Sequence, residues 1–198
     1  MPGKPKKRGF MMKTALLIID VQNDYFEGGR CVLAEPQKAL SNVEHVLKLF
    51  RERKMPIIHI QHIDTAGLIS WFQPGSRGAE IHERVKPLES EYHFAKNEPN
   101  CFFQTPLENI LRQEQVTHLV VCGMMTQVCV DTTVQAARYT GPGLQITLLS
   151  DACATKELAF DERTVSAPDV QAAYMAALNG RFANVIKASE LAGMMLPS

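Results

Sequence analysis

Residues 119–129 read LVVCGMMTQVC and join an apolar run to a segment with the composition of a helix start. The run at 119–122 is short and continuously apolar, as expected of a buried strand. A helix is expected over Thr126–Tyr139, with the Thr126 side chain as its N-cap. Cys129 then falls in the first helical turn, where unpaired N–H groups and the helix dipole favour a thiolate. The competing interpretation is a small buried cysteine that packs beneath the strand.

The same alternation of apolar runs and helix-forming segments continues on both sides of this stretch. Further strands are expected at residues 14–19, 56–60, 144–149 and 183–187, with a short one ending near 95–96. Further helices are expected at residues 36–53 and 166–179, and at a segment opened by Thr105 as cap and Pro106 as first helical residue. Strands that are apolar throughout and alternate with helices predict a three-layer, doubly wound α/β fold. In it, helices cover both faces of a predominantly parallel sheet of about six strands.

The domain organisation is simple. The length of 198 residues and the lack of an internal linker predict one domain over residues 13–198. Residues 1–12 contain a basic cluster interleaved with proline and glycine, and they are expected to form a disordered tail. A localisation signal or an RNA-binding patch is the alternative for this cluster.

Bulk composition narrows the classes of partner. Lysine plus arginine and aspartate plus glutamate both number 21, so no net charge attracts the chain to nucleic acid or to a membrane. No apolar run approaches the ~18 residues of a membrane-spanning helix, and the first residues lack the features of a secretory signal. Five cysteines without a CxxC pair favour a reducing environment over a disulfide framework. These features predict a cytoplasmic protein whose partner is a small molecule.

Three residues with catalytic potential follow predicted strands: Asp20, Lys96 and Cys129. In parallel sheets, ligands bind beyond the carboxyl ends of the strands, so these side chains are expected to converge. Cys129 is the candidate nucleophile, Asp20 the candidate proton carrier, and Lys96 the charge that stabilises both. The backbone N–H groups of Met125 and Cys129 are the candidate oxyanion hole.

Four blocks of sequence carry a family resemblance over residues 14–191. They are ALLIIDVQNDY at 15–25 with Gly28-Gly29, Lys96 with Phe102 and the segment 105–107, GMMTQVCV at 123–130, and Asp151-Ala152. In this order the blocks resemble the isochorismatase-like cysteine hydrolases, a superfamily that includes nicotinamidases and N-carbamoylsarcosine amidases. The resemblance implies a homo-oligomer, a cis peptide between Met124 and Met125, and a catalytic triad of Asp20, Lys96 and Cys129.

The chain departs from the nicotinamidases in its metal-binding motif. Nicotinamidases similar to this chain carry an Asp-x-His after the second strand, with further histidines, and hold a metal there. The matching region here reads His62-Ile63-Asp64, and the next histidine is His82, in a loop. A zinc or iron site from His62, Asp64 and His82 is the alternative. The missing spacing predicts an enzyme without metal or cofactor that is not a nicotinamidase.

Three further side chains are expected to contact the substrate. Tyr25 belongs to the first block, where its family counterpart is aromatic and faces the pocket. His62 ends its strand on the side of the site, and Trp71 lies in a loop, 64–87, that is long enough to cover a site. For Trp71 the alternative is an anchor that holds this loop on the core.

The complete set of Asp20, Lys96 and Cys129 predicts a cysteine hydrolase. Its expected reaction is cleavage of a C–N bond in a small amide, carbamoyl or lactam-like compound, through a thioester at Cys129. One alternative is isochorismatase activity, the hydrolysis of a vinyl ether, which enzymes of this fold often perform without the cysteine. The other alternative is a non-catalytic binding protein that kept the fold.

Overall fold

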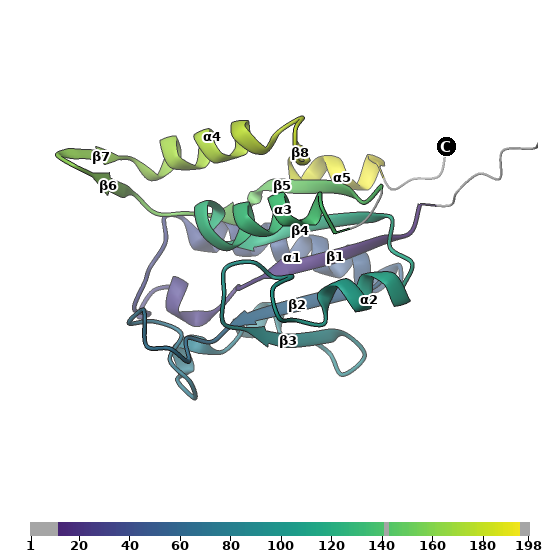
Figure 1. Cartoon of the computed structure of the whole chain (residues 1–198), viewed down its shortest axis with the longest axis horizontal. Coiled ribbons are helices and arrows are strands. Elements are labelled where there is room, and N and C mark those ends of the chain that lie inside the picture. Colours follow the sequence, from purple (N-terminus) through teal and green to yellow (C-terminus); the bar gives the residue numbers. More distant parts are fainter. Residues whose placement is uncertain (1–11, 141–142, 195–198) are drawn as a thin grey trace, which may run out of the picture.

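The computed structural model describes residues 12–140 and 143–194, and it shows the expected three-layer α/β fold (Figure 1). Six parallel strands form one sheet in the order β3-β2-β1-β4-β5-β8. Their bounds are Thr14–Ile19 (β1), Ile57–His62 (β2), Tyr92–Lys96 (β3), His118–Met124 (β4), Gln145–Ala154 (β5) and Asn184–Ile186 (β8). Every residue of β1 and β4 is buried, which explains why these strands are almost continuously apolar.

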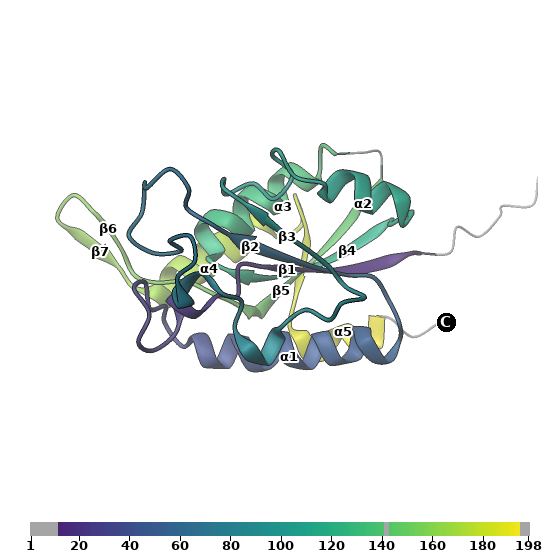
Figure 2. The same cartoon turned by 90° about the horizontal axis from the view of Figure 1, so that it is seen from below.

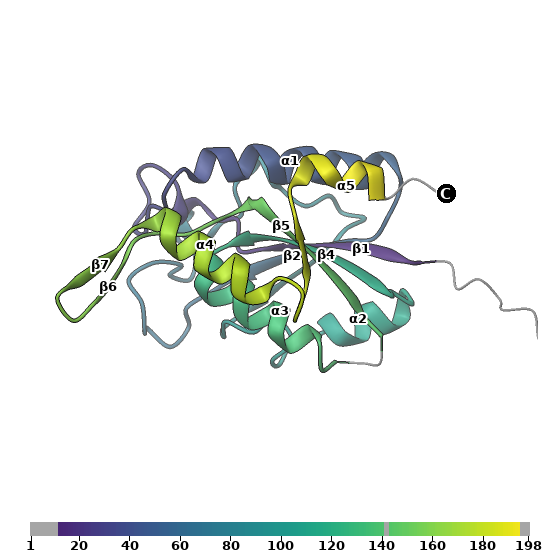
Figure 3. The same cartoon turned by 90° about the horizontal axis from the view of Figure 1, so that it is seen from above.

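Helices cover both faces of this sheet, as Figures 2 and 3 show from opposite sides. α1 and α5 lie on one face, and α2, α3 and α4 lie on the other. Their bounds are Pro36–Glu52 (α1), Leu107–Gln113 (α2), Asp131–Ala137 (α3), Ala167–Leu178 (α4) and Ala188–Met194 (α5). The buried apolar side chains accordingly form two clusters, one on each face of the sheet. The doubly wound architecture predicted from the sequence is therefore confirmed.

The strand order places β1 and β4 side by side in the middle of the sheet. From β1 the chain proceeds outward to β2 and β3, and from β4 it proceeds outward to β5 and β8 on the other side. This reversal is the topological switch point, where doubly wound sheets bind ligands beyond the carboxyl ends of the strands. Asp20 follows β1 here, Lys96 ends β3, and Cys129 follows β4.

Several short elements escaped the sequence prediction. A hairpin of β6 (Leu158–Phe160) and β7 (Arg163–Val165) projects from the body of the molecule, and α5 follows β8 (Figure 1). Strands of three residues and a helix of seven are too short to leave a periodic pattern. β5 continues to Ala154, beyond its expected end, because an irregularity in register renews its pairing with β4.

The start of α2 and the amino-terminal tail differ in how they compare with the sequence prediction. The helix expected to open at Thr105 begins at Leu107, and Pro106 precedes it instead of forming its first residue. The basic tail predicted for residues 1–12 lies, apart from Met12, outside the described residues.

Candidate active site

Asp20 leaves β1 in a left-handed backbone conformation, with φ at +51°. Its N–H donates to the carbonyl oxygen of Ile60 at 3.1 Å, which ties the residue to the neighbouring strand β2. The side chain is fully buried at this end of the sheet. A residue other than glycine in this conformation costs about 1–3 kcal/mol, and such residues cluster at functional sites.

Gly123 allows the end of β4 to lie close against β1. A Cβ atom at this position would be 2.0 Å from the carbonyl oxygen of Ile19, and the φ angle is +131°. Only glycine fits both conditions. The peptide bond between Met124 and Met125 is cis, which is the geometry that the family resemblance implies.

Cys129 lies in a π-helical turn, Thr126–Val130, and not in the α-helix expected over residues 126–139. The N–H of Val130 donates to the carbonyl oxygen of Met125 at 3.2 Å, the spacing of a π-turn. The regular helix α3 begins only after this turn. Single π-turns of this kind occur frequently at functional sites.

The Thr126 side chain does not cap this turn, which corrects the sequence prediction. Its hydroxyl instead donates to Oε1 of Gln171, in α4, at 2.7 Å. Thr126 therefore fastens the turn that carries Cys129 to the neighbouring helix.

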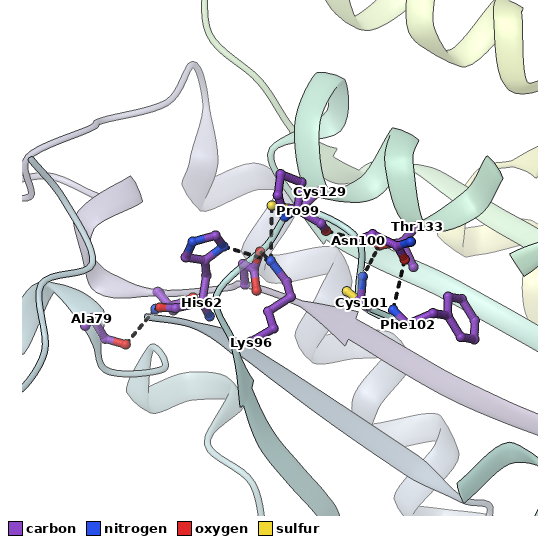
Figure 4. A network of polar contacts seen from close by, with 11 residues as sticks. His62, Ala79, Lys96, Pro99, Asn100, Cys101, Phe102, Cys129 and Thr133 are labelled. Carbon is purple, nitrogen blue, oxygen red and sulfur yellow. Dashed lines mark hydrogen bonds and ion pairs between the residues drawn. The ribbon is translucent and has the colours of Figure 1, made fainter. Parts of the chain in front are cut away.

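Three side chains surround the Lys96 ammonium group at the carboxyl ends of the strands (Figure 4). Its Nζ atom lies 2.7 Å from Oδ2 of Asp20, 2.9 Å from Nδ1 of His62 and 3.3 Å from Sγ of Cys129. All four side chains are buried. The fold thus brings together the three residues expected to converge, and it adds His62 to them.

Burial is the largest influence on the pKa values of Cys129 and Lys96. It raises the pKa of the Cys129 thiol well above its usual range; the Asp20 carboxylate raises it further, and the Lys96 ammonium opposes both effects. Burial by itself lowers the pKa of Lys96, but the charges of Asp20 and Cys129 outweigh it and hold that pKa above its ordinary value. Burial and the Asp20 carboxylate therefore oppose the thiolate that the helix end was expected to favour, whereas the Lys96 ammonium supports it.

Two of the three expected substrate contacts lie beside the cluster. Tyr25 is fully buried; burial, followed by the charges of Cys129 and Asp20, raises the pKa of its phenol. His62 contacts the ammonium group directly. Trp71 is partly buried against the core, and Nζ of Lys156 lies 5.5 Å from its ring centroid. These contacts fit the loop anchor that the sequence left open as the alternative, and contact of Trp71 with a substrate stays a prediction.

Phe72, the neighbour of Trp71, is the loop residue that reaches the site. Its backbone N–H donates to Oδ2 of the buried Asp24 at 2.6 Å, which fastens the loop 64–87 at this point. Its ring centroid lies 4.8 Å from that of Tyr25 and 5.8 Å from that of His62. No sequence pattern distinguishes Phe72 from Trp71, so only the folded loop reveals which ring packs beside Tyr25 and His62.

The alternative metal ligands are occupied with other contacts. Asp64 accepts N–H bonds from its own loop, and these bonds lower the pKa of its carboxyl group. The His82 ring packs against Phe26, with centroids 4.5 Å apart. In the described part of the chain, the donor atoms that gather within 4.8 Å of one another are those of Asp20, His62 and Cys129. The Lys96 ammonium contacts all three, and an enzyme without metal stays a prediction.

Gln22 is a site residue that the sequence analysis missed. Its Nε2 atom donates to the carbonyl oxygens of His62 at 2.8 Å and Ala79 at 2.7 Å, and its Oε1 atom accepts the N–H of His62 at 2.8 Å. The side chain is fully buried, so these bonds satisfy an amide that water does not reach. A polar residue inside the first block, directly after a buried strand, was the available signal.

Comparison with known proteins agrees with this architecture. Residues 14–190 match the family model of the isochorismatase domain. The isochorismatase family protein YddQ of Bacillus subtilis is 46% identical over 174 residues, which cover 88% of this chain and 96% of the relative. Streptothricin hydrolase of Streptomyces noursei is 30% identical over 169 residues, which cover 85% of this chain and 57% of that protein.

A crystal structure gives the same result. An isochorismatase hydrolase from Oleispira antarctica has a TM-score of 0.87 and 38% identity, and the match covers 92% of this chain and 97% of that one. The chain therefore belongs to the isochorismatase family. Within residues 12–140 and 143–194, every helix falls short of the length and apolarity that crossing a bilayer requires.

Proposed function

We propose that this protein is a cysteine hydrolase that cleaves a C–N bond of a small amide, carbamoyl or lactam-like compound through a thioester at Cys129. The contacts of the Lys96 ammonium with Asp20 at 2.7 Å and with Cys129 at 3.3 Å carry the proposal. A thiol that shares a buried site with a proton acceptor and a fixed positive charge is suited to acyl transfer. Membership of a family of hydrolases supports the same conclusion.

The first half-reaction forms the thioester. Asp20 removes the proton of the Cys129 thiol while sulfur attacks the carbonyl carbon of the substrate. Lys96 contacts both groups, so its charge remains paired as the negative charge moves from carboxylate to sulfur. The backbone N–H groups of Met125 and Cys129 are the proposed oxyanion donors, each worth roughly 10²–10³ in rate. Asp20 then returns its proton to the leaving nitrogen as the C–N bond breaks.

The second half-reaction releases the acid. With the amine gone, the Asp20 carboxylate removes a proton from a water molecule, and the resulting hydroxide attacks the thioester carbonyl. The C–S bond breaks, and the proton held by Asp20 returns to sulfur. One water is consumed, and Cys129 ends as the thiol with which it began. Because its side chain is only 3% exposed, the site favours a small substrate, with Tyr25 and His62 as its nearest proposed contacts.

Trapping the acyl intermediate tests this proposal. The protein is mixed with a panel of small amides, carbamates and ureas, quenched in acid and digested, and each cysteine peptide is weighed by mass spectrometry. We expect the acyl mass on Cys129 for every substrate that turns over. Cys153→Ala, which removes a buried cysteine of β5, is the matched control and keeps the adduct. Adducts confined to other cysteines contradict the proposal, as does full turnover by Cys129→Ala.

Hydrolysis of isochorismate is the second candidate, because the matching family model is that of the isochorismatase domain. This reaction cleaves a vinyl ether and does not require the cysteine nucleophile. Release of pyruvate from isochorismate by Cys129→Ala at the wild-type rate favours this candidate. If the chain is instead a binding protein without catalysis, neither the amide-type compounds nor isochorismate should be turned over.

The projecting hairpin supports a proposal of self-association. Phe160 in β6 is 77% exposed, and a two-stranded hairpin without a packed face is marginally stable in water. We expect a second copy of the chain to contact it, so light scattering should give a multiple of 22.1 kDa. A mass of one chain contradicts this expectation.

A further inference from the structure

The cluster contains one group to which the mechanism above assigns no step, the imidazole of His62. His62 ends β2 directly beside Lys96 of β3, and its Nδ1 atom lies 2.9 Å from Nζ. We propose that His62 is a positioning residue for the nucleophile. As a neutral ring protonated on Nε2, it accepts one N–H of the Lys96 ammonium and keeps the other two directed at Asp20 and Cys129. This inference rests on the proposed function, since it concerns the same thiol.

The number of donors supports this assignment. A lysine ammonium carries three N–H groups and no acceptor. The three neighbours of Nζ are an oxygen of Asp20, a nitrogen of His62 and the sulfur of Cys129. The Lys96 side chain is fully buried, so an N–H without one of these partners is also without water. Removing one acceptor therefore frees the ammonium to turn away from the other two.

The contact also determines the form of the imidazole. A ring nitrogen accepts a hydrogen bond only when it carries no proton, so the proton of neutral His62 lies on Nε2. Burial lowers the pKa of His62 and the charge of Lys96 lowers it further, while the carboxylates of Asp20, Asp64 and Glu98 act in the opposite direction. Protonation of Nδ1 in acid would place two cations in contact and reverse the interaction.

The backbone of His62 is held in place by the side chain of Gln22. Gln22 bonds to both the N–H and the carbonyl oxygen of His62, each at 2.8 Å. A third bond to the carbonyl oxygen of Ala79 holds the Gln22 amide itself. The chain of contacts runs from Gln22 through His62 to Lys96, so the ring has little freedom to leave the ammonium.

Alkylation of Cys129 by iodoacetamide tests this role without a substrate. His62→Ala removes the acceptor, and His62→Asn, the matched control, places a carbonyl oxygen near the position of Nδ1. The rate of alkylation is followed from pH 5 to pH 10 on the Cys129 peptide by mass spectrometry. We expect His62→Ala to react about tenfold more slowly at pH 8, which corresponds to a thiol pKa raised by about one unit. His62→Asn should stay within about threefold of the wild type.

The acid side of the profile separates positioning from simple packing. Below pH 6.5, in the range where His62 with its lowered pKa begins to take up a proton, the wild-type rate should fall more steeply than that of His62→Asn, because protonation of His62 adds a second proton to the inactive state. Equal slopes overturn the proposal, and so does a His62→Asn variant as slow as His62→Ala. A wild-type profile in His62→Ala overturns it as well. If His62→Ala does not fold, the acid-side slopes of the wild type and of His62→Asn still decide whether His62 has the positioning role.

Failure of the positioning role and failure of the proposed hydrolysis give different results. Alkylation reports on the cluster whether or not an amide substrate is found. An acyl adduct on Cys129 together with an unchanged profile in His62→Ala would leave the hydrolase and remove the positioning role.

Discussion

The two ends of the central strands hold two buried polar clusters of opposite character. The amino-end cluster consists of Thr14, His118 and Thr147, and the carboxyl-end cluster consists of Asp20, His62, Lys96 and Cys129. In the amino-end cluster, Nδ1 of His118 lies 3.0 Å from the Thr14 hydroxyl and Nε2 lies 2.8 Å from the Thr147 hydroxyl. Both ring nitrogens have a partner, and burial lowers the pKa of the ring, which keeps it neutral.

The carboxyl-end cluster is satisfied less completely. It contains an ion pair, and among the described residues neither carboxylate oxygen of Asp20 receives a hydrogen bond beyond that pair. Buried acceptors without such partners are rare in folded proteins and call for an explanation. In the proposed mechanism Asp20 accepts the proton of Cys129, and this role would account for the spare acceptor. We therefore expect the fully paired amino-end cluster to serve stability, and the carboxyl-end cluster, with its spare acceptor, to serve proton transfer.

Removal of the nucleophile should give the largest effect and the sharpest contrast between the two ends. Cys129→Ala is expected to lower turnover of the amide identified by the panel by more than about 10³-fold, because in the proposed mechanism no other group forms the thioester. The urea midpoint of this variant should change little, since the side chains of cysteine and alanine differ by one heavy atom. A loss below tenfold in initial rate would remove Cys129 from the mechanism.

Breaking the ion pair should make the carboxyl-end cluster costly to the fold. Lys96→Met leaves the Asp20 carboxylate buried without its partner, and we expect a loss of about 3–5 kcal/mol in the free energy of unfolding. Adding Asp20→Asn removes the orphaned charge, so the double variant should recover part of that loss while turnover stays absent. Urea titrations of the four proteins measure this cycle. Additive losses would mean that the two charges do not stabilise each other.

The amino-end cluster should respond in stability and not in turnover. His118→Ala leaves two buried threonine hydroxyls unpaired and a cavity between them, for an expected loss of about 2–4 kcal/mol. Turnover measured well below the unfolding temperature should remain within about twofold of the wild type. His45→Ala, at an exposed position of α1, is the control and should leave both quantities unchanged. A large loss of turnover in folded His118→Ala would contradict the separation of roles.

The smallest effect should appear in the pH dependence of stability. Burial lowers the pKa of His118 in the folded protein, so below about pH 6.5 the unfolded chain binds a proton that the folded chain refuses. Its contribution to stability is complete above that pH and is lost as the pH falls. His118→Gln removes this proton, so its urea midpoint should decline less between pH 7 and pH 5. An unchanged slope would show that His118 takes up its proton equally in the folded and the unfolded state.

The sequence predicted the elements whose pattern is local. The apolar runs of β1 and β4 and the helical periodicity of α1 identified the layers, and their order identified the edge of the sheet where Asp20, Lys96 and Cys129 meet. It failed where a local pattern is weak or misleading. The segment after β4 has the composition of an α-helix, but it forms a π-turn whose shape depends on contacts with α4.

The chain by itself determined the architecture, the order of the strands along it and the candidate nucleophile, because periodicity and residue type are properties of neighbouring residues. Folding alone decided that burial opposes ionisation of Cys129, that His62 contacts the Lys96 ammonium, that Gln22 holds the backbone of His62, and that the Phe72 ring packs beside His62. These outcomes depend on exclusion of water and on contacts between residues distant in the chain. Exclusion of water and contacts between distant residues both arise only when the helices and loops have packed around the ends of the strands.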